Sequence, residues 1–377
     1  MIIKRRITMI KTLRIASNKI LLLTLSSLLL LTACGDKDAV TVTTANEPAK
    51  TYQWKMVTSW PKNFPGLGIG PETFAKYVDE MSGGRLTVKV YGAGELVPGF
   101  EVFDAVSQGT VEMGHSGAYY WKGKMPASVI FGAIPFGMTT NEFNAWLQYG
   151  GGLALWQELY KPFGIVPMAG GSSGAQFAGW FKKEINSIAD LKGLKMRIPG
   201  LGGEVMKRAG AIPVTLTGGE IFSSLQSGAI DASEWVGPYN DLAFGFHQAA
   251  QYYYSSVWHE TGTNLEFLIN EKALLALPKD LQKIIEVAAR AVNQDMHDEY
   301  NARNHVALNT LIEKHNVQLR KLPDDVLQEL KKYTEQVLAE QVENDQDFAK
   351  VWQSYSEFLS SIRQYNDLTL KEYYQHR

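Results

Sequence analysis

The sequence contains one cysteine, Cys34, among 377 residues, and its seven histidines are scattered along the chain. With one thiol the chain forms no intramolecular disulfide. It needs none, because a chain of this length buries a large hydrophobic core. Zinc sites draw on clustered cysteines and histidines, so zinc is disfavoured as a bound metal.

The sequence also lacks an excess of positive charge and several catalytic signatures. Its formal net charge is -2 with 20% charged residues, whereas nucleic-acid-binding proteins carry a clustered basic surface. The zinc-protease pattern His-Glu-x-x-His is absent, and the glycine-rich run 200–203 lacks the Gly-Lys-Ser/Thr ending of a phosphate loop. We therefore expect a protein that binds a molecule without converting it, and no nucleic-acid partner.

Long hydrophobic runs are absent apart from residues 20–32, which are too few to span a bilayer core of about 30 Å. This run follows a basic segment and ends in Leu31-Thr32-Ala33-Cys34, as a lipoprotein signal peptide does. We expect a signal peptide at 1–33, a lipid on Cys34 and a polar, threonine-rich tether at 34–51. The alternative is a cleaved secretory signal with an incidental cysteine.

These features predict an extracytoplasmic, periplasmic lipoprotein that is anchored to a membrane by acyl chains on Cys34. Gly35 follows the cysteine and leaves open whether the inner or the outer membrane keeps the protein.

Beyond the tether, strand and helix patterns alternate. Residues 53–57 form a short mixed run, 74–81 have apolar residues at helical spacing, and Leu86, Val88 and Val90 alternate as in a strand. This order predicts an α/β fold in which helices cover parallel strands.

Two segments of the sequence resemble each other. Residues 101–113 and 220–232 both have a helical pattern, then a glycine, then a short apolar run. We interpret them as corresponding parts of two α/β lobes, although this order is common in α/β proteins. Because ligands bind beyond the carboxyl ends of strands, segments 115–121 and 233–239 are expected to face a cleft.

We therefore expect an α/β fold of two lobes with crossing strands and long bracing helices. Lobe I is expected at 52–174 plus about 263–300, and lobe II at 175–262. Residues from about 301 to 377 are expected to form C-terminal helices, which brace the lobes or form a homodimer.

Arg197 is the clearest candidate for a ligand-binding residue. It lies in a predicted strand at 194–198 that ends in Pro199-Gly200, so it stands at the carboxyl end of that strand. A guanidinium there can hold a carboxylate through two parallel hydrogen bonds. The pattern alone leaves a second interpretation open, a surface arginine on an edge strand.

The chain from about 54 to 278 resembles the solute-binding subunits of tripartite ATP-independent periplasmic (TRAP) transporters. Arg197, within Leu-Lys-Gly-Leu-Lys-Met-Arg-Ile-Pro-Gly, matches the family's signature arginine, and residues 220–232 match its other signature. The resemblance implies a two-lobed fold of the periplasmic-binding-protein (Venus flytrap) type. It also implies that Arg197 binds the carboxylate of the substrate and that membrane subunits of the transporter are partners.

A narrower resemblance concerns the branch that binds 2-oxo and 2-hydroxy acids with a metal ion. It rests on residues 173–177, 232–235 and 259–262. It implies that Gln176, Glu234, the carbonyl of Trp235 and Glu260 surround a sodium or calcium ion. Two glutamates and a bound acid exceed the charge of one arginine, and oxygen ligands suit hard cations. The alternative is that Glu234 or Glu260 forms an ordinary salt bridge.

Aromatic side chains are expected to line the same cleft, because they supply much of the surface of ligand sites. We expect this role for Trp60, Tyr120, Phe177 and Trp235. The resemblance also places one tyrosine on the ligand, and it does not decide between Tyr119 and Tyr120.

The function implied is capture of a small organic monocarboxylate, such as pyruvate or lactate, for a TRAP transporter. Two alternatives stay open: a ligand-presenting partner of a membrane sensor, and a binder of a larger organic acid.

Overall fold

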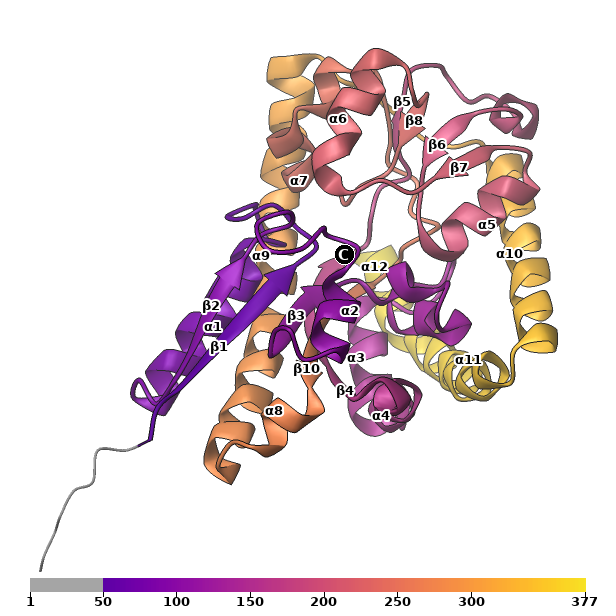
Figure 1. Ribbon diagram of the computed structural model, residues 1–377. Coiled ribbons are helices and arrows are strands. Elements are labelled where there is room, and N and C mark those ends of the chain that lie inside the picture. The colour runs from indigo at the N-terminus through magenta and orange to yellow at the C-terminus, as the bar shows by residue number, and fades with distance from the viewer. Residues whose placement is uncertain (1–49) are drawn as a thin grey trace, which may run out of the picture. The chain divides into compact units, whose positions relative to one another are not determined.

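Two β-sheets organise residues 50–377, the part of the chain that this computed structural model describes (Figure 1). The expected signal peptide, Cys34 and most of the tether lie outside the described residues. The first sheet has the order β2-β1-β3-β10-β4, with strands β1 (Tyr52–Thr58), β2 (Leu86–Tyr91), β3 (Met113–Ser116), β4 (Ile165–Gly174) and β10 (Thr263–Asn270). The second has the order β11-β9-β5-β8-β6-β7, with strands β5 (Gly179–Phe181), β6 (Lys195–Arg197), β7 (Ile212–Val214), β8 (Ala232–Ser233), β9 (Tyr252–Tyr254) and β11 (Gln318–Arg320).

The chain passes from the first sheet to the second between β4 and β5, and returns between β9 and β10. We call the first sheet with its helices lobe I, the second sheet with its helices lobe II, and residues 175–178 and 255–262 the crossing segments. All eight residues of β10 are buried, because this strand pairs antiparallel with both β3 and β4 in the interior of its sheet. The two-lobed α/β architecture expected from the sequence is therefore present.

The two similar segments of the sequence occupy corresponding places in the two lobes. The first gives α2 (Val102–Ser107) followed by β3, and the second gives α6 (Gly218–Ser227) followed by β8. A capping box of Thr217 and Glu220 begins α6, and Gly228 ends it at φ 81°. Both strands pair in parallel, β3 with β1 and β8 with β6, so their carboxyl ends carry the following residues into the space between the lobes.

One long helix, α9 (Lys279–His315), packs on both lobes (Figure 1). Leu281, Ile285 and Val292 belong to a core cluster with strands β1 and β10 of lobe I. Met296, Tyr300 and Leu311 belong to a cluster with Trp180 and Trp235 of lobe II. The helix runs to His315, past residue 300, where the sequence analysis placed the boundary between lobe I and the C-terminal helices. The other α-helices that precede α9 are α1 (Ile69–Ser82), α3 (Thr140–Tyr149), α4 (Gly152–Tyr160), α5 (Gly200–Arg208), α7 (Pro238–Phe244) and α8 (Glu271–Leu275).

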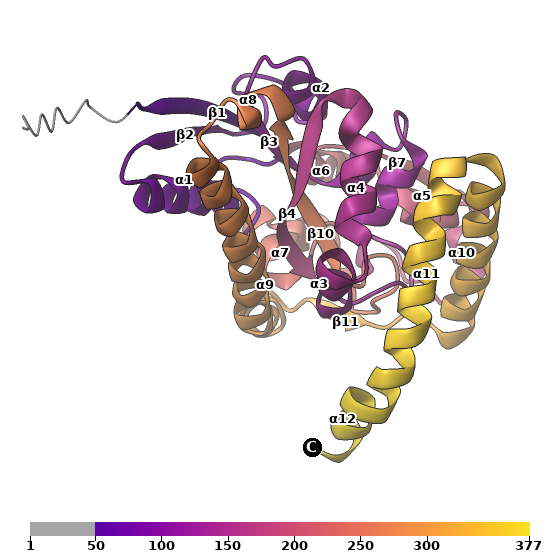
Figure 2. The same ribbon diagram turned by 90° about the horizontal axis from the view of Figure 1, so that it is seen from below.

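The C-terminal segment contains α10 (Asp324–Asn344), α11 (Gln346–Asn366) and α12 (Glu372–His376), and the end of this segment projects away from the sheets (Figure 2). It also supplies β11, which pairs in parallel with β9 of lobe II. The sequence predicted helices alone for this part of the chain. Within residues 50–377, no helix combines the length and apolar character needed to cross a membrane.

Candidate functional site: a buried arginine and two glutamates between the lobes

A small cavity lies between the lobes, with a volume of about 10 Å³ for the centre of a water-sized sphere. That is room for about one water molecule. Both lobes and both crossing segments contribute to its wall, which consists of Trp60, Leu67, Tyr119, Ser173, Gln176, Arg197, Glu234, Trp235, Val236, Glu260 and Leu265. Seven of the site residues expected from the sequence lie in this wall: Trp60, Tyr119, Gln176, Arg197, Glu234, Trp235 and Glu260.

Arg197 is 1% exposed and points into the cavity from the carboxyl end of β6. Its Nε donates to the Leu216 carbonyl at 3.2 Å, and its Nη2 donates to the Tyr120 hydroxyl at 3.3 Å. Its Nη1 pairs with the Glu234 carboxylate. The guanidinium is therefore held in one orientation by groups from two segments of lobe II and one of lobe I.

Glu234 follows β8, and Gly179 allows this segment to approach β5 closely. At φ 115°, a Cβ on Gly179 would lie 2.4 Å from the Ser233 carbonyl oxygen and 2.8 Å from the Cα of Glu234. Only glycine fits there. The backbone N–H of Glu234 donates to the Arg197 carbonyl at 3.2 Å, which places the glutamate beside the arginine on the neighbouring strand.

Gln176 and Glu260 come from the two crossing segments, which are joined directly. The Gln176 backbone N–H donates to the Glu260 carbonyl at 2.9 Å. The Gln176 amide donates to Ser173 Oγ at 2.8 Å and to Thr263 Oγ1 at 3.1 Å. Thr263 in turn donates to the Glu260 carboxylate at 2.5 Å. These bonds turn the amide oxygen of Gln176 and the carboxylate of Glu260 towards the cavity.

The charges in this cluster are not balanced by the arginine. Arg197, Glu234 and Glu260 are all buried, and one cation with two carboxylates leaves one negative charge when all are ionised. Burial is the largest influence and works against the charge of Arg197. The attractions of Glu234, Tyr120, Tyr119 and Glu260 together outweigh burial and raise the pKa of the guanidinium. Burial, and then repulsion from Glu234, raise the pKa of Glu260. A cation placed here would relieve that repulsion.

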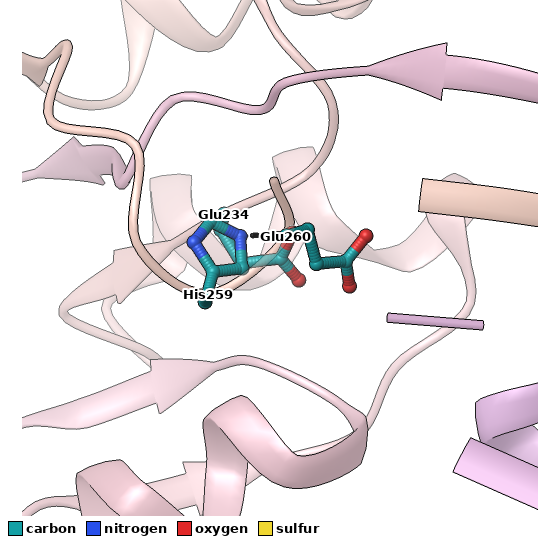
Figure 3. Close-up of side chains that lie close together, drawn as sticks. All are labelled: Glu234, His259 and Glu260. Atoms are coloured by element: carbon teal, nitrogen blue, oxygen red, sulfur yellow. Dashed lines mark ion pairs between the residues drawn. The ribbon is translucent and has the colours of Figure 1, made fainter. Parts of the chain in front are cut away.

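The donors present fit such a cation. Oε1 of Gln176 and Oε2 of Glu234 are buried and find no hydrogen-bond partner among the described residues. Donor atoms of Glu234, His259 and Glu260 lie within 4.8 Å of one another (Figure 3). Buried polar atoms nearly always have partners, so two oxygens left without one on residues that line the same cavity indicate a ligand. Carboxylate and amide oxygens are ligands for hard cations.

His259 is a residue of this cluster to which the sequence analysis gave no role, although it lies in one of the matched segments. Its Nε2 lies 3.4 Å from Oε2 of Glu234, and the side chain is 1% exposed. Its position next to Glu260 in the sequence was the available signal.

The aromatic residues expected in the cleft occupy three different positions. Trp60, Tyr119 and Trp235 line the cavity, and Trp60 and Trp235 meet across the lobes with ring centroids 6.1 Å apart. Tyr120 contacts Arg197 through its hydroxyl and lines a wider neighbouring groove with Tyr119. Phe177 was expected in the cleft, but its ring packs on Tyr253, 5.0 Å between centroids, within the core of lobe II.

Residues 170–174 match Gly-x-Ser-x-Gly, the pattern of a hydrolase nucleophile, but their structure differs from that of a nucleophile elbow. The pattern lies inside β4 instead of at a strand-to-helix turn. The hydroxyl of Ser172 donates to the Thr263 carbonyl at 2.7 Å and shares a hydrogen bond with Thr140. Within residues 50–377 Ser172 has no histidine partner, so its hydroxyl serves the packing of the strand.

The fold and the site together are those of a two-lobed solute-binding protein, with a buried arginine in the wall of the cavity between the lobes. The sequence matches the family described as bacterial extracellular solute-binding protein, family 7, over residues 56–345, and the chain belongs to this family. Membership confirms the expectation of an extracytoplasmic binding protein and not an enzyme.

Three similar proteins indicate which kind of solute-binding protein this chain resembles within the family. The chain is 45% identical over 314 residues to the monocarboxylate 2-oxoacid-binding periplasmic protein of Nostoc sp. (strain PCC 7120), covering 83% of this chain and 86% of the relative. It superimposes with a TM-score of 0.85 on a TRAP periplasmic solute-binding protein of Pseudoalteromonas atlantica with bound sodium and pyruvate, at 41% identity, covering 87% of this chain and 100% of that one. A TRAP protein of Colwellia psychrerythraea with bound calcium and pyruvate gives a TM-score of 0.85 at 42% identity and the same coverage. The chain is thus a TRAP solute-binding protein.

Proposed function

We propose that this protein captures a small 2-oxo monocarboxylate such as pyruvate, or the related 2-hydroxy acid, together with one cation, and delivers the acid to the membrane subunits of a TRAP transporter. One observation supports it above others. A buried arginine that can grip a carboxylate shares one cavity with a carboxylate oxygen of Glu234 and the amide oxygen of Gln176, and neither oxygen has a hydrogen-bond partner among residues 50–377. The similar structures contain pyruvate with sodium or with calcium, which supports pyruvate as the acid and sodium or calcium as the cation.

In this proposal Arg197 holds the carboxylate, and Gln176, Glu234, the Trp235 carbonyl and Glu260 hold sodium or calcium. The cation supplies positive charge that offsets the second glutamate and attracts the oxygens of the acid. Trp60, Leu67 and Leu265 present apolar surface to the side chain of the acid. The cavity has room for about one water molecule. This small size favours short acids over long ones.

We propose the lobe boundaries 52–174 plus about 263–300 and 175–262, and two of the proposed cation ligands, Gln176 and Glu260, lie on the crossing segments. An acid held between Arg197 of lobe II and Tyr119 of lobe I stabilises the closed arrangement, because each contributes fully only when the lobes meet. The transporter can then distinguish loaded from empty protein by its shape.

Titration calorimetry tests the proposal directly. Pyruvate is expected to bind in the presence of sodium or calcium, and its affinity is expected to fall by at least about tenfold after chelation in sodium-free buffer. Arg197→Ala is expected to abolish measurable binding, since charged hydrogen bonds contribute about 1.5–3 kcal/mol each. Arg197→Lys is expected to fail as well, because lysine lacks the two-pronged geometry. Unchanged affinity in either arginine variant would refute the role of Arg197.

We further propose that the mature protein carries a lipid on Cys34, on the strength of the Leu31-Thr32-Ala33-Cys34 sequence that follows a short hydrophobic run. Mass spectrometry of the protein from a membrane fraction is expected to find a diacylglycerol thioether on this residue. An unmodified thiol at Cys34 would contradict the anchor.

We also propose a homodimer through the C-terminal helices. The projecting end of α11 and α12 (Figure 2) exposes apolar and aromatic side chains, namely Tyr365, Leu368, Leu370, Tyr373 and Tyr374. Such a patch marks an interaction surface, and a second copy of the chain offers the same patch in a symmetric pairing. Sedimentation is expected to give a dimer that Leu368→Lys with Tyr373→Lys converts to a monomer. A monomeric wild type at tens of micromolar would refute it.

A further inference from the structure

We infer that His259 is a nitrogen ligand of the cation site, so that the site accepts borderline divalent transition ions such as Co²⁺ and Zn²⁺ in addition to hard cations. The inference rests on the proposed cation site and adds to it a donor of a different chemical kind.

The first support is position. His259 reaches the cluster from the crossing segment that also carries Glu260, and its ring lies beside the two carboxylates (Figure 3). Its Nε2 is 3.4 Å from Oε2 of Glu234, which is long for a hydrogen bond. Two donors that are each about 2.1 Å from one tetrahedral ion lie about 3.4 Å apart. The separation therefore suits two ligands of a common ion better than a donor and an acceptor.

The second support is the state of the ring nitrogens. Both Nδ1 and Nε2 of His259 are buried and lack a hydrogen-bond partner within the described part of the chain. His115 shows what a structural buried histidine looks like in the same protein. Its Nδ1 accepts from the Trp60 indole at 2.8 Å, and its Nε2 bonds the Gly170 carbonyl at 2.8 Å. Of these two buried histidines, His259 is the one whose nitrogens remain available to a ligand.

The chemical consequence concerns which metal binds. Carboxylate, amide and carbonyl oxygens select sodium, calcium and manganese, whereas imidazole adds affinity for zinc, cobalt and nickel. One imidazole with two carboxylates is a donor set that a transition ion can occupy. This qualifies the argument from composition that zinc is disfavoured, because that argument counted the histidines without placing them.

Pulsed EPR of the purified protein loaded with Mn²⁺ alone tests the inference without using acid binding. We expect echo modulation from a directly bound ¹⁴N nucleus, and we expect excess Ca²⁺ to remove it by displacing the ion from the same site. His259→Gln keeps a polar side chain of similar length and is expected to lose the modulation. His305→Gln, on the exposed face of α9, is the matched control and is expected to retain it.

A second readout is selectivity. By calorimetry, His259→Gln is expected to lower the preference for Co²⁺ over Ca²⁺ by at least about tenfold, the scale of losses at metal sites when supporting groups are removed. Bound Mn²⁺ without ¹⁴N modulation in the wild type would overturn the role of His259 and leave the oxygen-ligand site of the proposed function intact. Failure of Mn²⁺, Ca²⁺ and Na⁺ alike to bind would overturn both. If His259→Gln fails to fold, the ¹⁴N echo modulation of the wild type with and without excess Ca²⁺ still tests whether a nitrogen binds the ion.

Discussion

Two buried glutamates in this protein have opposite surroundings. Glu266 lies on β10 in the core of lobe I and is fully buried. One of its carboxylate oxygens accepts from the Trp121 indole at 2.5 Å, and the other accepts from the Tyr160 hydroxyl at 2.9 Å. Glu234 lies between the lobes, where one oxygen meets Arg197 and the other has no hydrogen-bond partner in the described residues.

The difference separates a structural acid from a binding acid. The neutral donors around Glu266 complete the hydrogen bonding of both its oxygens, and burial raises its pKa to about 8. At neutral pH it is therefore mostly protonated and has no need of a cation. Glu234 contacts Arg197 through one oxygen. Its other oxygen lacks a hydrogen-bond partner among the described residues, as does the amide oxygen of Gln176 in the wall of the same cavity. Burial and acidity are shared by the two residues, so the incomplete hydrogen bonding of Glu234 is what identifies a ligand site.

The same substitution at both glutamates is expected to give the largest contrast. Glu234→Gln removes a charged cation ligand, so we expect cation affinity to fall by about a hundredfold or more. Pyruvate affinity is expected to fall with it, because the cation attracts the acid. Glu266→Gln is expected to leave both affinities within about twofold. Calorimetry with Ca²⁺ and then with pyruvate measures both.

Equal losses in the two variants would mean that the comparison is wrong and that Glu266 shapes the site through Trp121. If both variants keep the wild-type affinities for Ca²⁺ and pyruvate, Glu234 is only a salt-bridge partner of Arg197, which is the alternative that the sequence left open.

Sequence reasoning located the arginine because its position depends on local rules. A short apolar strand that ends in Pro199-Gly200 places Arg197 at the cleft end of a sheet whatever the rest of the chain does. The lobes followed from similar reasoning, since the alternation of helices and strands and the repeated segment are local patterns. The contact between Gln176 and Glu260, which joins the two crossing segments, was reached only through the family resemblance. Its partners are far apart in the chain, and their pairing depends on how the lobes meet.

The aromatic and histidine assignments show where local reasoning stops. Phe177 follows Gln176 directly, and consecutive side chains outside a helix point in different directions. Only one of the two can therefore face the cavity. Tyr119 and Tyr120 sit in the 3₁₀ turn Ala118–Trp121, where successive residues are about a third of a turn apart. One lines the cavity and the other meets Arg197. His259 could not be assigned because composition alone does not reveal which histidine has unused ring nitrogens.

The titration of Glu266, the structural member of the pair of glutamates, is expected to make the stability of the folded protein depend on pH. Because the pKa of Glu266 is raised by burial from 4.5 to about 8, the folded state holds this proton while the unfolded state releases it between those values. The folded protein therefore loses stability as the pH rises from about 4.5 to 8, on the order of a few kcal/mol. Glu266→Gln does not titrate, so its free energy of unfolding is expected to rise relative to the wild type over that range.

Denaturant unfolding of both proteins between pH 5 and pH 9 measures this difference, and the other titrating groups cancel because the two proteins share them. A difference that stays constant with pH would mean that Glu266 is ionised in the folded protein and that its surroundings stabilise the charge.

The smallest expected effect belongs to a third carboxylate, which extends the comparison to the surface. Glu204 on α5 of lobe II pairs with Lys122, which follows the turn Ala118–Trp121 of lobe I. The side chains are 36% and 34% exposed, so water screens the pair and its contribution is about 0.2–1 kcal/mol.

Lys122→Ala is expected to weaken pyruvate binding by no more than about fivefold, because the pair favours the closed lobes without touching the acid. The loss is expected to vanish at about 1 M salt, where the screening length is about 3 Å. Exchanging the charges in Lys122→Glu with Glu204→Lys is expected to restore the affinity. A loss that persists in high salt and survives the exchange would mean that Lys122 acts on the ligand site itself, which would place a charged group from lobe I in the site beside Arg197.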